Sequence, residues 1–198
     1  MKSNILHPLS VQGELIDRGT LLFTLREFSR IFHISPVGTK YFLETYAKKG
    51  LFTRLKKGLY GLKRHLPPEG EIANALYRPS YISFEYALAK YGIIPEMPYS
   101  ITSATVKPTR TFSVAGKTFS YFKIKKQFFT GYLSSKEEER VVLIAEPEKA
   151  LVDYLYFVSL GKKFYNDRLN IANLNKEKII KYAGLFKRSG LMKLVKKL

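Results

Sequence analysis

The sequence predicts an α+β fold in two domains, residues 1–66 and 67–198, on the strength of three observations. Apolar residues at helical spacing, with capping residues at the helix ends, dominate the first 50 positions. Short runs of β-branched and aromatic residues bounded by glycine turns follow, and this pattern is typical of strands. The stretch "HLPPEG", residues 65–70, interrupts both patterns and therefore marks the domain boundary.

The first domain begins with two predicted helices. A short amphipathic stretch ends at Gly19, and its apolar residues are Leu9, Val11, Leu15 and Ile16. In "TLRE", Thr24 and Glu27 have the spacing of a capping box, which marks the start of the second helix. The apolar stripe of that helix consists of Leu25, Phe28, Ile31 and Phe32.

A third helix follows after the tight link "HIS". Ser35 is its expected N-cap, Pro36 occupies the favoured first position, and Gly50 closes the helix. One face carries the apolar positions Thr39, Phe42, Leu43 and Tyr46. The other face, or its edge, carries Gly38, Lys40, Tyr41, Thr45 and Lys48.

The stretch "TRLKKGLYGLKR", residues 53–64, then predicts a basic hairpin. Gly58 supplies the turn, and Leu55 and Leu59 anchor the hairpin to the domain. Two capped helices joined by a short turn and followed by a basic hairpin have the order of a winged helix-turn-helix. In such a domain the second helix of the pair enters the major groove, and its N-terminus suits a phosphate.

The predicted DNA contacts come from the third helix and the hairpin. They are Ser35, Val37, Gly38, Lys40, Tyr41, Thr45, Lys48, Arg54, Lys56, Lys57, Lys63 and Arg64. Winged helices also serve as protein–protein modules, but residues 40–64 carry a net charge of +7, and these are the elements that would touch DNA. The charge therefore favours DNA binding.

The whole chain has a formal net charge of +18, which indicates a polyanionic partner. Besides the +7 block, residues 162–198 carry +9, while residues 67–161 carry only +1. We expect the basic tail to form a second basic surface, although its helices could also pack on the body with their lysines merely solvated. Its candidate residues are Lys162, Lys163, Lys187, Arg188, Lys193, Lys196 and Lys197.

The second domain combines helices and about four or five strands. Strands are expected at 81–82, 99–105, 109–125 (a hairpin that turns at Ala115–Gly116) and 140–145. Ser83 is the expected cap of a helix that stops at Gly92, and a longer helix spans 146–160. The tail adds helical patterns at 176–182 and 188–198.

Little in the sequence indicates catalysis, a metal or a cofactor, so we expect a protein that is not an enzyme and binds none. All three histidines lie in the first 65 residues, cysteine is absent, and there is no phosphate-binding glycine loop. The compact carboxylate group consists of Glu146, Glu148 and Asp153. The first two acids suit a helix start, and Asp153 suits a bond to backbone or to a basic partner.

A cytoplasmic location is expected. No apolar run approaches the roughly 20 residues of a membrane span. The opening "MKSNILHPLS" lacks the apolar core of a signal peptide.

Four stretches together resemble the AbiEi-like antitoxin family, the transcriptional regulators of type IV, abortive-infection toxin–antitoxin operons. "KKGLFTRLKKGLYGL" is similar to the family's helix end and wing, and "RTFSVAGKTFSYFKI" to its hairpin. "YISFEYALAKYGIIPEMP" is similar to a family segment with an Ala-Leu helix, and "AEPEKALVDYLY" to its pattern Ala-x-Pro-Glu-Lys/Arg-Ala-Leu-x-Asp. The resemblance covers roughly residues 20–160.

The resemblance implies a repressor that binds an inverted-repeat operator of its own operon as double-stranded DNA. It also implies a functional partner, a nucleotidyltransferase-type toxin, which the antitoxin counters without requiring a stable complex. In the family the wing often carries arginine where this chain has Lys56 and Lys57. Lysine is a point charge and lacks the planar, bidentate donor geometry by which arginine binds guanine. We therefore expect this wing to contact phosphates rather than to read bases.

Two alternatives remain at the level of the sequence. One is a winged-helix regulator whose second domain senses a ligand or a partner. The other is an enzyme that acts through Asp153 and its neighbouring acids.

Overall fold

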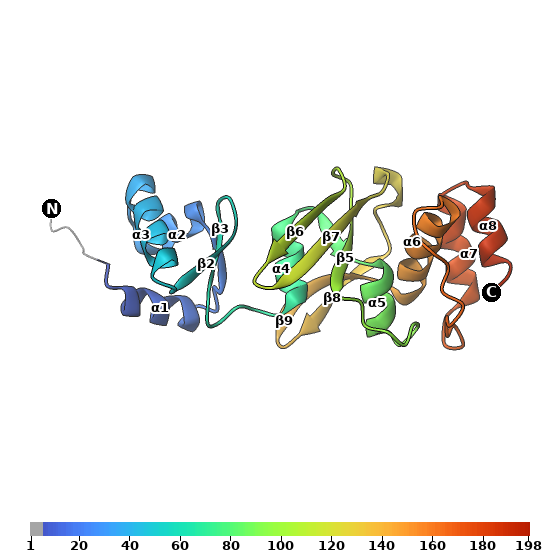
Figure 1. Cartoon of the computed structure of the whole chain (residues 1–198), viewed down its shortest axis with the longest axis horizontal. Helices are drawn as coiled ribbons and strands as arrows, with labels where there is room; N and C mark the ends of the chain where they lie inside the picture. The colour runs from blue at the N-terminus through green and yellow to red at the C-terminus, as the bar shows by residue number, and fades with distance from the viewer. Residues whose placement is uncertain (1–5) are drawn as a thin grey trace. The chain divides into compact units, whose positions relative to one another are not determined.

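The computed structural model describes residues 6–198 and shows a mixed α+β chain (Figure 1). The chain divides into two compact units, the first ending at Pro68 and the second spanning Glu69–Leu198, against a predicted boundary between residues 66 and 67. Residues 1–5, which are part of the segment considered for a signal peptide, lie outside the described residues.

The first unit contains three helices and a small antiparallel sheet. In chain order its elements are α1 (Pro8–Asp17), β1 (Leu22–Thr24), α2 (Leu25–Phe32), α3 (Pro36–Lys48), β2 (Phe52–Lys56) and β3 (Leu59–Leu62). The strands lie in the order β1-β3-β2. The sequence did not indicate β1, a three-residue strand that is too short to show an alternating pattern.

Capping side chains fix where α2 and α3 begin, as predicted. The Thr24 hydroxyl accepts a hydrogen bond from the Glu27 N–H at 3.2 Å, and the Thr24 N–H donates to the Glu27 carboxylate at 2.7 Å. This confirms the capping box. Ser35 accepts from the Gly38 N–H at 3.1 Å. Between the two helices His33 adopts a left-handed backbone with φ 52°, which makes the turn tight.

The core of the first unit is aromatic. Phe23, Phe28, Phe42 and Phe52 are buried together, with ring centroids 5.4–6.2 Å apart. These four side chains come from β1, α2, α3 and β2, so a single cluster ties the helix pair to the sheet. The inner face of α3 is thereby fixed, and its opposite face is left to solvent.

The second unit is built on a six-stranded mixed sheet in the order β6-β7-β5-β4-β9-β8. The pairs β4–β9 and β5–β7 are parallel, and the remaining neighbours are antiparallel. The strands are β4 (Ser80–Ile82), β5 (Ser100–Thr105), β6 (Arg110–Val114), β7 (Lys117–Lys123), β8 (Tyr132–Glu137) and β9 (Arg140–Ala145). The helices are α4 (Glu69–Leu76), α5 (Phe84–Lys90), the short 3-10 helix η1 (Lys126–Phe128), α6 (Pro147–Ser159), α7 (Lys176–Leu185) and α8 (Ser189–Val195).

Helices pack on the sheet and on one another. α4 lies against β4, β5 and β9, whereas α5 lies against β5 and α6. α6 also packs against α7 and α8, so it forms the centre of the helical part of this unit (Figure 1). The expected count of four or five strands was too low, because the edge strand β8 is mostly exposed and polar and lacks the pattern of a strand.

Candidate nucleic-acid interface

The outer face of α3 is a continuous exposed stripe. Its members follow one another at helical spacing along the whole helix: Val37, Lys40, Tyr41, Glu44 and Lys48. The opposite face is buried through Thr39, Phe42 and Leu43, as the sequence pattern predicted. Because the core holds that face, the stripe is presented on a rigid helix rather than on a loop.

Two large side chains of this stripe extend into solvent. Val37 is 80% exposed and Tyr41 is 74% exposed, yet both are large and apolar or amphipathic. They alternate with Lys40, so the stripe mixes apolar contact with positive charge. That mixture suits a DNA major groove, which offers thymine methyl groups on its base edges and phosphates along its rim.

The other residues predicted on this helix lie at its margins. Ser35 is exposed, but its hydroxyl already accepts from the Gly38 N–H as the N-cap. Gly38 and Thr45 are half-buried beside the stripe. A Cβ added at Gly38 would lie 3.2 Å from the Ser35 hydroxyl oxygen, so a larger residue would press on the cap.

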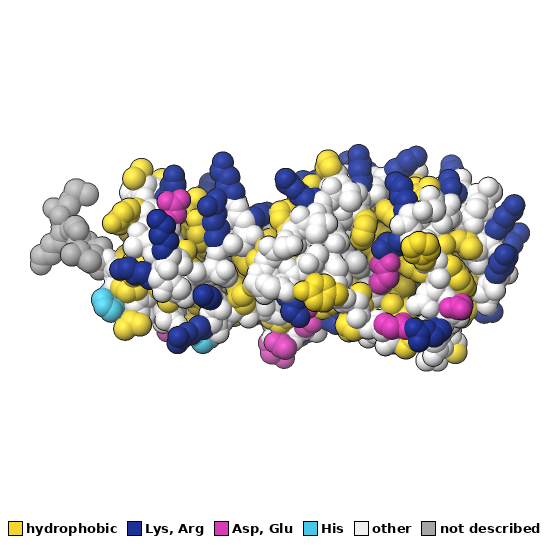
Figure 2. Space-filling model, viewed as in Figure 1, with side chains coloured by type: hydrophobic (Ala, Val, Ile, Leu, Met, Phe, Trp, Pro, Cys, Tyr) yellow, Lys and Arg dark blue, Asp and Glu magenta, His cyan; other side chains and the backbone are white. Residues whose placement is uncertain are grey.

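The β2–β3 hairpin carries three of the predicted cations: Lys56 and Lys57 at its tip, and Arg54 in the middle of β2. Gly58 turns the chain with φ 80°, and Leu55 and Leu59 are buried beneath it, as predicted. Arg54 and Lys57 are exposed, and Lys56 is half-buried. Figure 2 shows the Lys and Arg side chains gathered over α3 and over this hairpin.

Lys63 and Arg64 lie elsewhere in the first unit. They follow the last residue of β3, so they mark the base of the hairpin and are separated from the turn at Gly58 by the four residues of that strand. They are exposed, but the structure does not bring them together with Lys56 and Lys57 at the tip. The predicted set of phosphate contacts therefore divides into two places on this unit.

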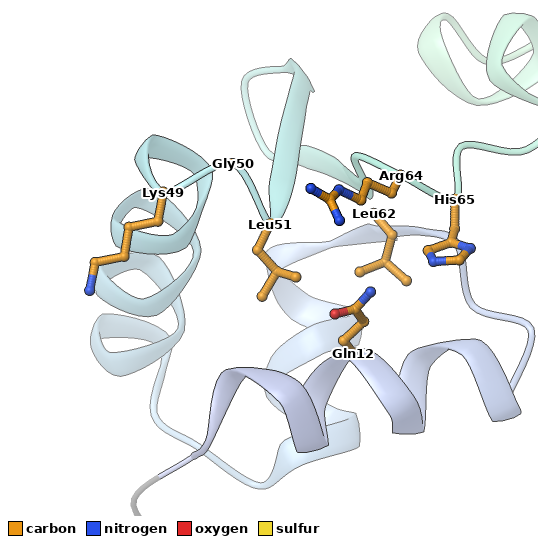
Figure 3. A pocket seen from close by; sticks show the side chains of 7 residues that line it. All are labelled: Gln12, Lys49, Gly50, Leu51, Leu62, Arg64 and His65. Atoms are coloured by element: carbon orange, nitrogen blue, oxygen red, sulfur yellow. The ribbon is translucent and has the colours of Figure 1, made fainter.

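Arg64 borders an open hollow of about 220 Å³ between α1, the end of α3 and the end of β3 (Figure 3). Its guanidinium extends over the hollow above Gln12 and beside Leu51, with His65 on the other side (Figure 3). The Lys49 side chain runs along the outer side of α3, away from Arg64 (Figure 3). The Arg64 guanidinium is thus the group that extends across this hollow.

Three charged residues that are absent from the predicted set of DNA contacts are exposed on α2 and α3. Arg26 and Arg30 are exposed one turn apart on α2, where a first helix that crosses the DNA backbone would carry cations. Glu44 lies within the α3 stripe, and a carboxylate there would accept from a cytosine amino group. The helical spacing of residues 37, 40, 41 and 44 was the signal for including Glu44.

The second basic surface is smaller than predicted. Five of its seven residues are exposed: Lys162, Lys187, Lys193, Lys196 and Lys197. The Lys163 ammonium instead donates to both oxygens of Glu85 and lies 4.3 Å from the centroid of the Phe122 ring. The Arg188 guanidinium donates to the Ser159 hydroxyl at 2.9 Å and to the Ser159 carbonyl at 2.7 Å. Lys163 and Arg188 therefore form bonds within the second unit and do not belong to an exposed basic surface.

A buried polar network lies between β4 and α6. Lys149 and Asp153 are both 0% exposed and form an ion pair one turn apart on α6. Tyr81 and Ser83 each donate to the Asp153 carboxylate at 2.9 Å, and the Lys149 ammonium donates to the Tyr81 oxygen at 2.9 Å. Asp153 therefore has the basic partner that the sequence suggested, together with two hydroxyl donors that it did not.

The electrostatics of this network follow from burial. Burial lowers the pKa of the Lys149 ammonium, and the adjacent Asp153 carboxylate opposes that shift. Burial and the same carboxylate raise the pKa of Tyr81 well above its ordinary value, so the phenol keeps its proton. Because every member of the network is inside the protein, the arrangement favours a structural role for Asp153.

The other two acids of the carboxylate group point elsewhere. Glu146 forms an ion pair with Lys178 at 2.8 Å, and Glu148 accepts from the Asn175 N–H at 3.1 Å. Both bonds attach the start of α7 to the start of α6. Among residues 6–198, no three His, Cys, Asp or Glu side chains gather in a way that could hold a metal ion.

Comparison with known proteins identifies no family. No protein-family model matches the chain, and no curated protein is significantly similar to it. Among the helices of the described residues, none has both the length and the apolar character needed to cross a bilayer.

Proposed function

We propose that the first unit is a winged helix-turn-helix that binds double-stranded DNA, with α3 in the major groove and the β2–β3 hairpin as the wing. The order helix, strand, two helices and hairpin supports this proposal. In this class of domain the N-terminal part of the second helix reads base edges. Val37, Lys40 and Tyr41 occupy that part of α3.

One observation carries the proposal: the exposed α3 stripe joins Val37 and Tyr41 to lysines, beside a basic hairpin. Val37 and Tyr41 give this face apolar contact area beside its lysines, which suits base edges as well as phosphates. Within the first unit one acidic residue, Glu44, interrupts the stripe, and most neighbouring charges are positive. The stripe thus combines the chemistry of base reading with that of phosphate contact.

The test is selection of duplexes from a random library by the full chain, followed by fluorescence anisotropy on the enriched sequence and on a scrambled duplex. We expect an enriched inverted repeat that binds at least about tenfold more tightly than the scrambled duplex. Affinity without any sequence preference would refute reading by α3. No affinity for DNA in 50 mM salt would refute the proposal as a whole.

We further propose that the protein is the antitoxin and autorepressor of a type IV toxin–antitoxin operon. The support is the resemblance of residues 20–160 to the AbiEi-like family, whose members neutralise through the second domain. The test is co-expression with the product of the adjacent gene. We expect that gene to encode a nucleotidyltransferase-type toxin and the full chain to restore growth. A neighbour that is harmless when expressed alone would favour a plain regulator.

A further inference from the structure

The last two helices, α7 and α8, border a groove that the proposed DNA binding does not use. Its volume is about 180 Å³, and it lies between the chain before α7, α7 itself and the end of α8. The apolar lining comes from Ile171, Ile179, Val195 and Leu198, with Ile180 at the edge and 55% exposed. The groove therefore offers an aliphatic floor that is open to solvent.

Two lysines border this apolar floor. Lys176 comes from the first residue of α7 and Lys196 from the residue after α8, and both are exposed. Neither forms an ion pair with a carboxylate of the described residues. Lys193 and Lys197 lie close by in the chain, within a tail of net charge +9. An occupant must accordingly combine an apolar group with negative charge at its flanks.

The size of the groove restricts what that group can be. Drug-sized and cofactor-sized molecules occupy pockets of about 300–1,000 Å³, so 180 Å³ is too small. A groove of this size suits one aliphatic side chain. A short peptide segment with a single apolar anchor fits this volume.

A basic tail could bind either a nucleic acid or an acidic protein segment, and the lining of the groove favours one of the two. Unpaired bases bind by stacking on aromatic side chains, and none of the residues that line this groove is aromatic. Duplex DNA presents phosphates to a basic surface, but its methyl groups, those of thymine, lie inside the major groove and would not fill a recess between two helices. An acidic protein segment offers both features.

We propose that the groove between α7 and α8 binds an acidic segment of a partner protein, with one Leu, Ile, Val or Phe side chain in the groove and Asp or Glu residues against Lys176 and Lys196. This interaction is independent of the DNA binding proposed for the first unit. Because the groove holds only one anchor, the contact is of the weak and transient kind.

The test selects random dodecamer peptides displayed on phage against the immobilised full chain. The enriched peptides are then measured by fluorescence anisotropy in 150 mM salt. We expect a consensus with one apolar residue flanked by at least two acids. Enrichment of peptides without an apolar anchor, or no enrichment at all, would overturn the proposal.

Two matched variants on α7 separate the groove from net charge. Ile180→Asp places one negative charge at the groove, whereas Lys181→Glu changes the charge by two units at an exposed position that does not line it. We expect Ile180→Asp to weaken peptide binding at least tenfold and Lys181→Glu to weaken it less than threefold. An equal or larger loss with Lys181→Glu would show that only net charge matters, and the proposal would be wrong.

A duplex DNA of 20 base pairs provides the remaining comparison, with thermal unfolding as the check on folding. Ile180 is exposed, so we expect both variants to melt within about 3 °C of the native chain. We expect the duplex to bind Ile180→Asp at least as well as it binds Lys181→Glu. If Ile180→Asp instead weakens DNA binding by tenfold, the groove belongs to a nucleic-acid surface.

Discussion

Lys40 and Tyr41 test base reading at the level of single residues. Both are exposed in the first half of α3, so each can meet a base edge if the helix enters the major groove. We expect Lys40→Ala and Tyr41→Ala each to cost about 1–3 kcal/mol on the selected duplex and little on a scrambled one. Anisotropy titrations on both duplexes check this, and an equal loss on the two would make the residue a phosphate contact.

Asp153 tests the buried network. Replacing Asp153 with Ala removes the carboxylate and leaves the Lys149 ammonium buried without its partner, so we expect a loss of about 3–5 kcal/mol in the free energy of unfolding. Ser83→Ala removes only one donor to that carboxylate and serves as the milder comparison, at about 1–2 kcal/mol. Urea unfolding measures both. A loss of less than 1 kcal/mol for Asp153→Ala would contradict the structural role.

Tyr154 predicts an alkaline loss of stability. Burial raises the pKa of this phenol to about 12, and its hydroxyl donates to the Phe164 carbonyl at 2.6 Å. An unfolded tyrosine titrates near pH 10, so the folded state holds the proton more tightly. The stabilisation is complete below pH 10 and is lost as the pH rises from about 10 to 12.

The measurement compares the native chain with Tyr154→Phe by urea unfolding at pH 8, 10 and 11. Because phenylalanine does not titrate, we expect the stability difference between the two proteins to shrink as the pH rises. A difference that stays constant over this range would show that the phenol is not held in its protonated form.

At the level of elements, the hairpin is predicted to act through phosphates. Replacing Lys56 and Lys57 with Ala should weaken binding to all duplexes alike and reduce the salt slope by up to about 2, since each neutralised phosphate contributes ~0.9. The double variant Lys125→Ala, Lys126→Ala removes two exposed cations from the second unit and is the matched control. An unchanged slope in the Lys56, Lys57 variant would remove the hairpin from the interface.

The elements that could be predicted from the sequence are those with local signals. Thr24 with Glu27, and Ser35 with Pro36, determine two helix starts through bonds to residues three positions away. Likewise Ala115 and Gly116, both at positive φ, turn the β6–β7 hairpin where the sequence indicated. Such features can be predicted from the sequence because the residues that determine them lie within a few positions of one another.

Elements and site residues that depend on distant partners could not be predicted. Ser83 begins a helix as expected, but its side chain makes no capping bond and instead donates to Asp153, 70 residues away. The sequence predicts Arg188 to be a surface cation, yet its guanidinium donates a hydrogen bond to the Ser159 hydroxyl. α4 begins just after two prolines and contains Gly70, so the sequence suggested a linker where packing against the sheet stabilises a helix.

At the level of the whole molecule, variants of the tail test whether the second unit neutralises the toxin while the first unit binds DNA. Charge reversal of three exposed lysines should abolish protection against the toxin and leave the fold intact; the residues are Lys193, Lys196 and Lys197. Arg188 is kept, because its bonds to Ser159 fasten α8 to α6. The matched control reverses three exposed lysines outside the tail: Lys123, Lys125 and Lys126.

Growth of cells that express the toxin, together with circular dichroism of each purified variant, measures the outcome. Loss of protection in the tail variant alone would assign neutralisation to the tail. A folded tail variant that protects as well as the native chain would reduce the second basic surface to a solvated face.

The bond between Tyr81 and Asp153 also sets an order of events during synthesis. The two residues are 72 positions apart, which a ribosome translating about 5–20 residues per second covers in about 4 to 14 seconds. All the core residues of the first unit precede position 63, so that unit has its complete core before β4 has been made. A nascent or prematurely terminated chain would accordingly carry a finished first unit and an unfolded second one. If the first unit binds the operator, such a chain would silence its operon without supplying the part that restrains the toxin, so truncating mutations after position 68 would be dominant over the intact gene.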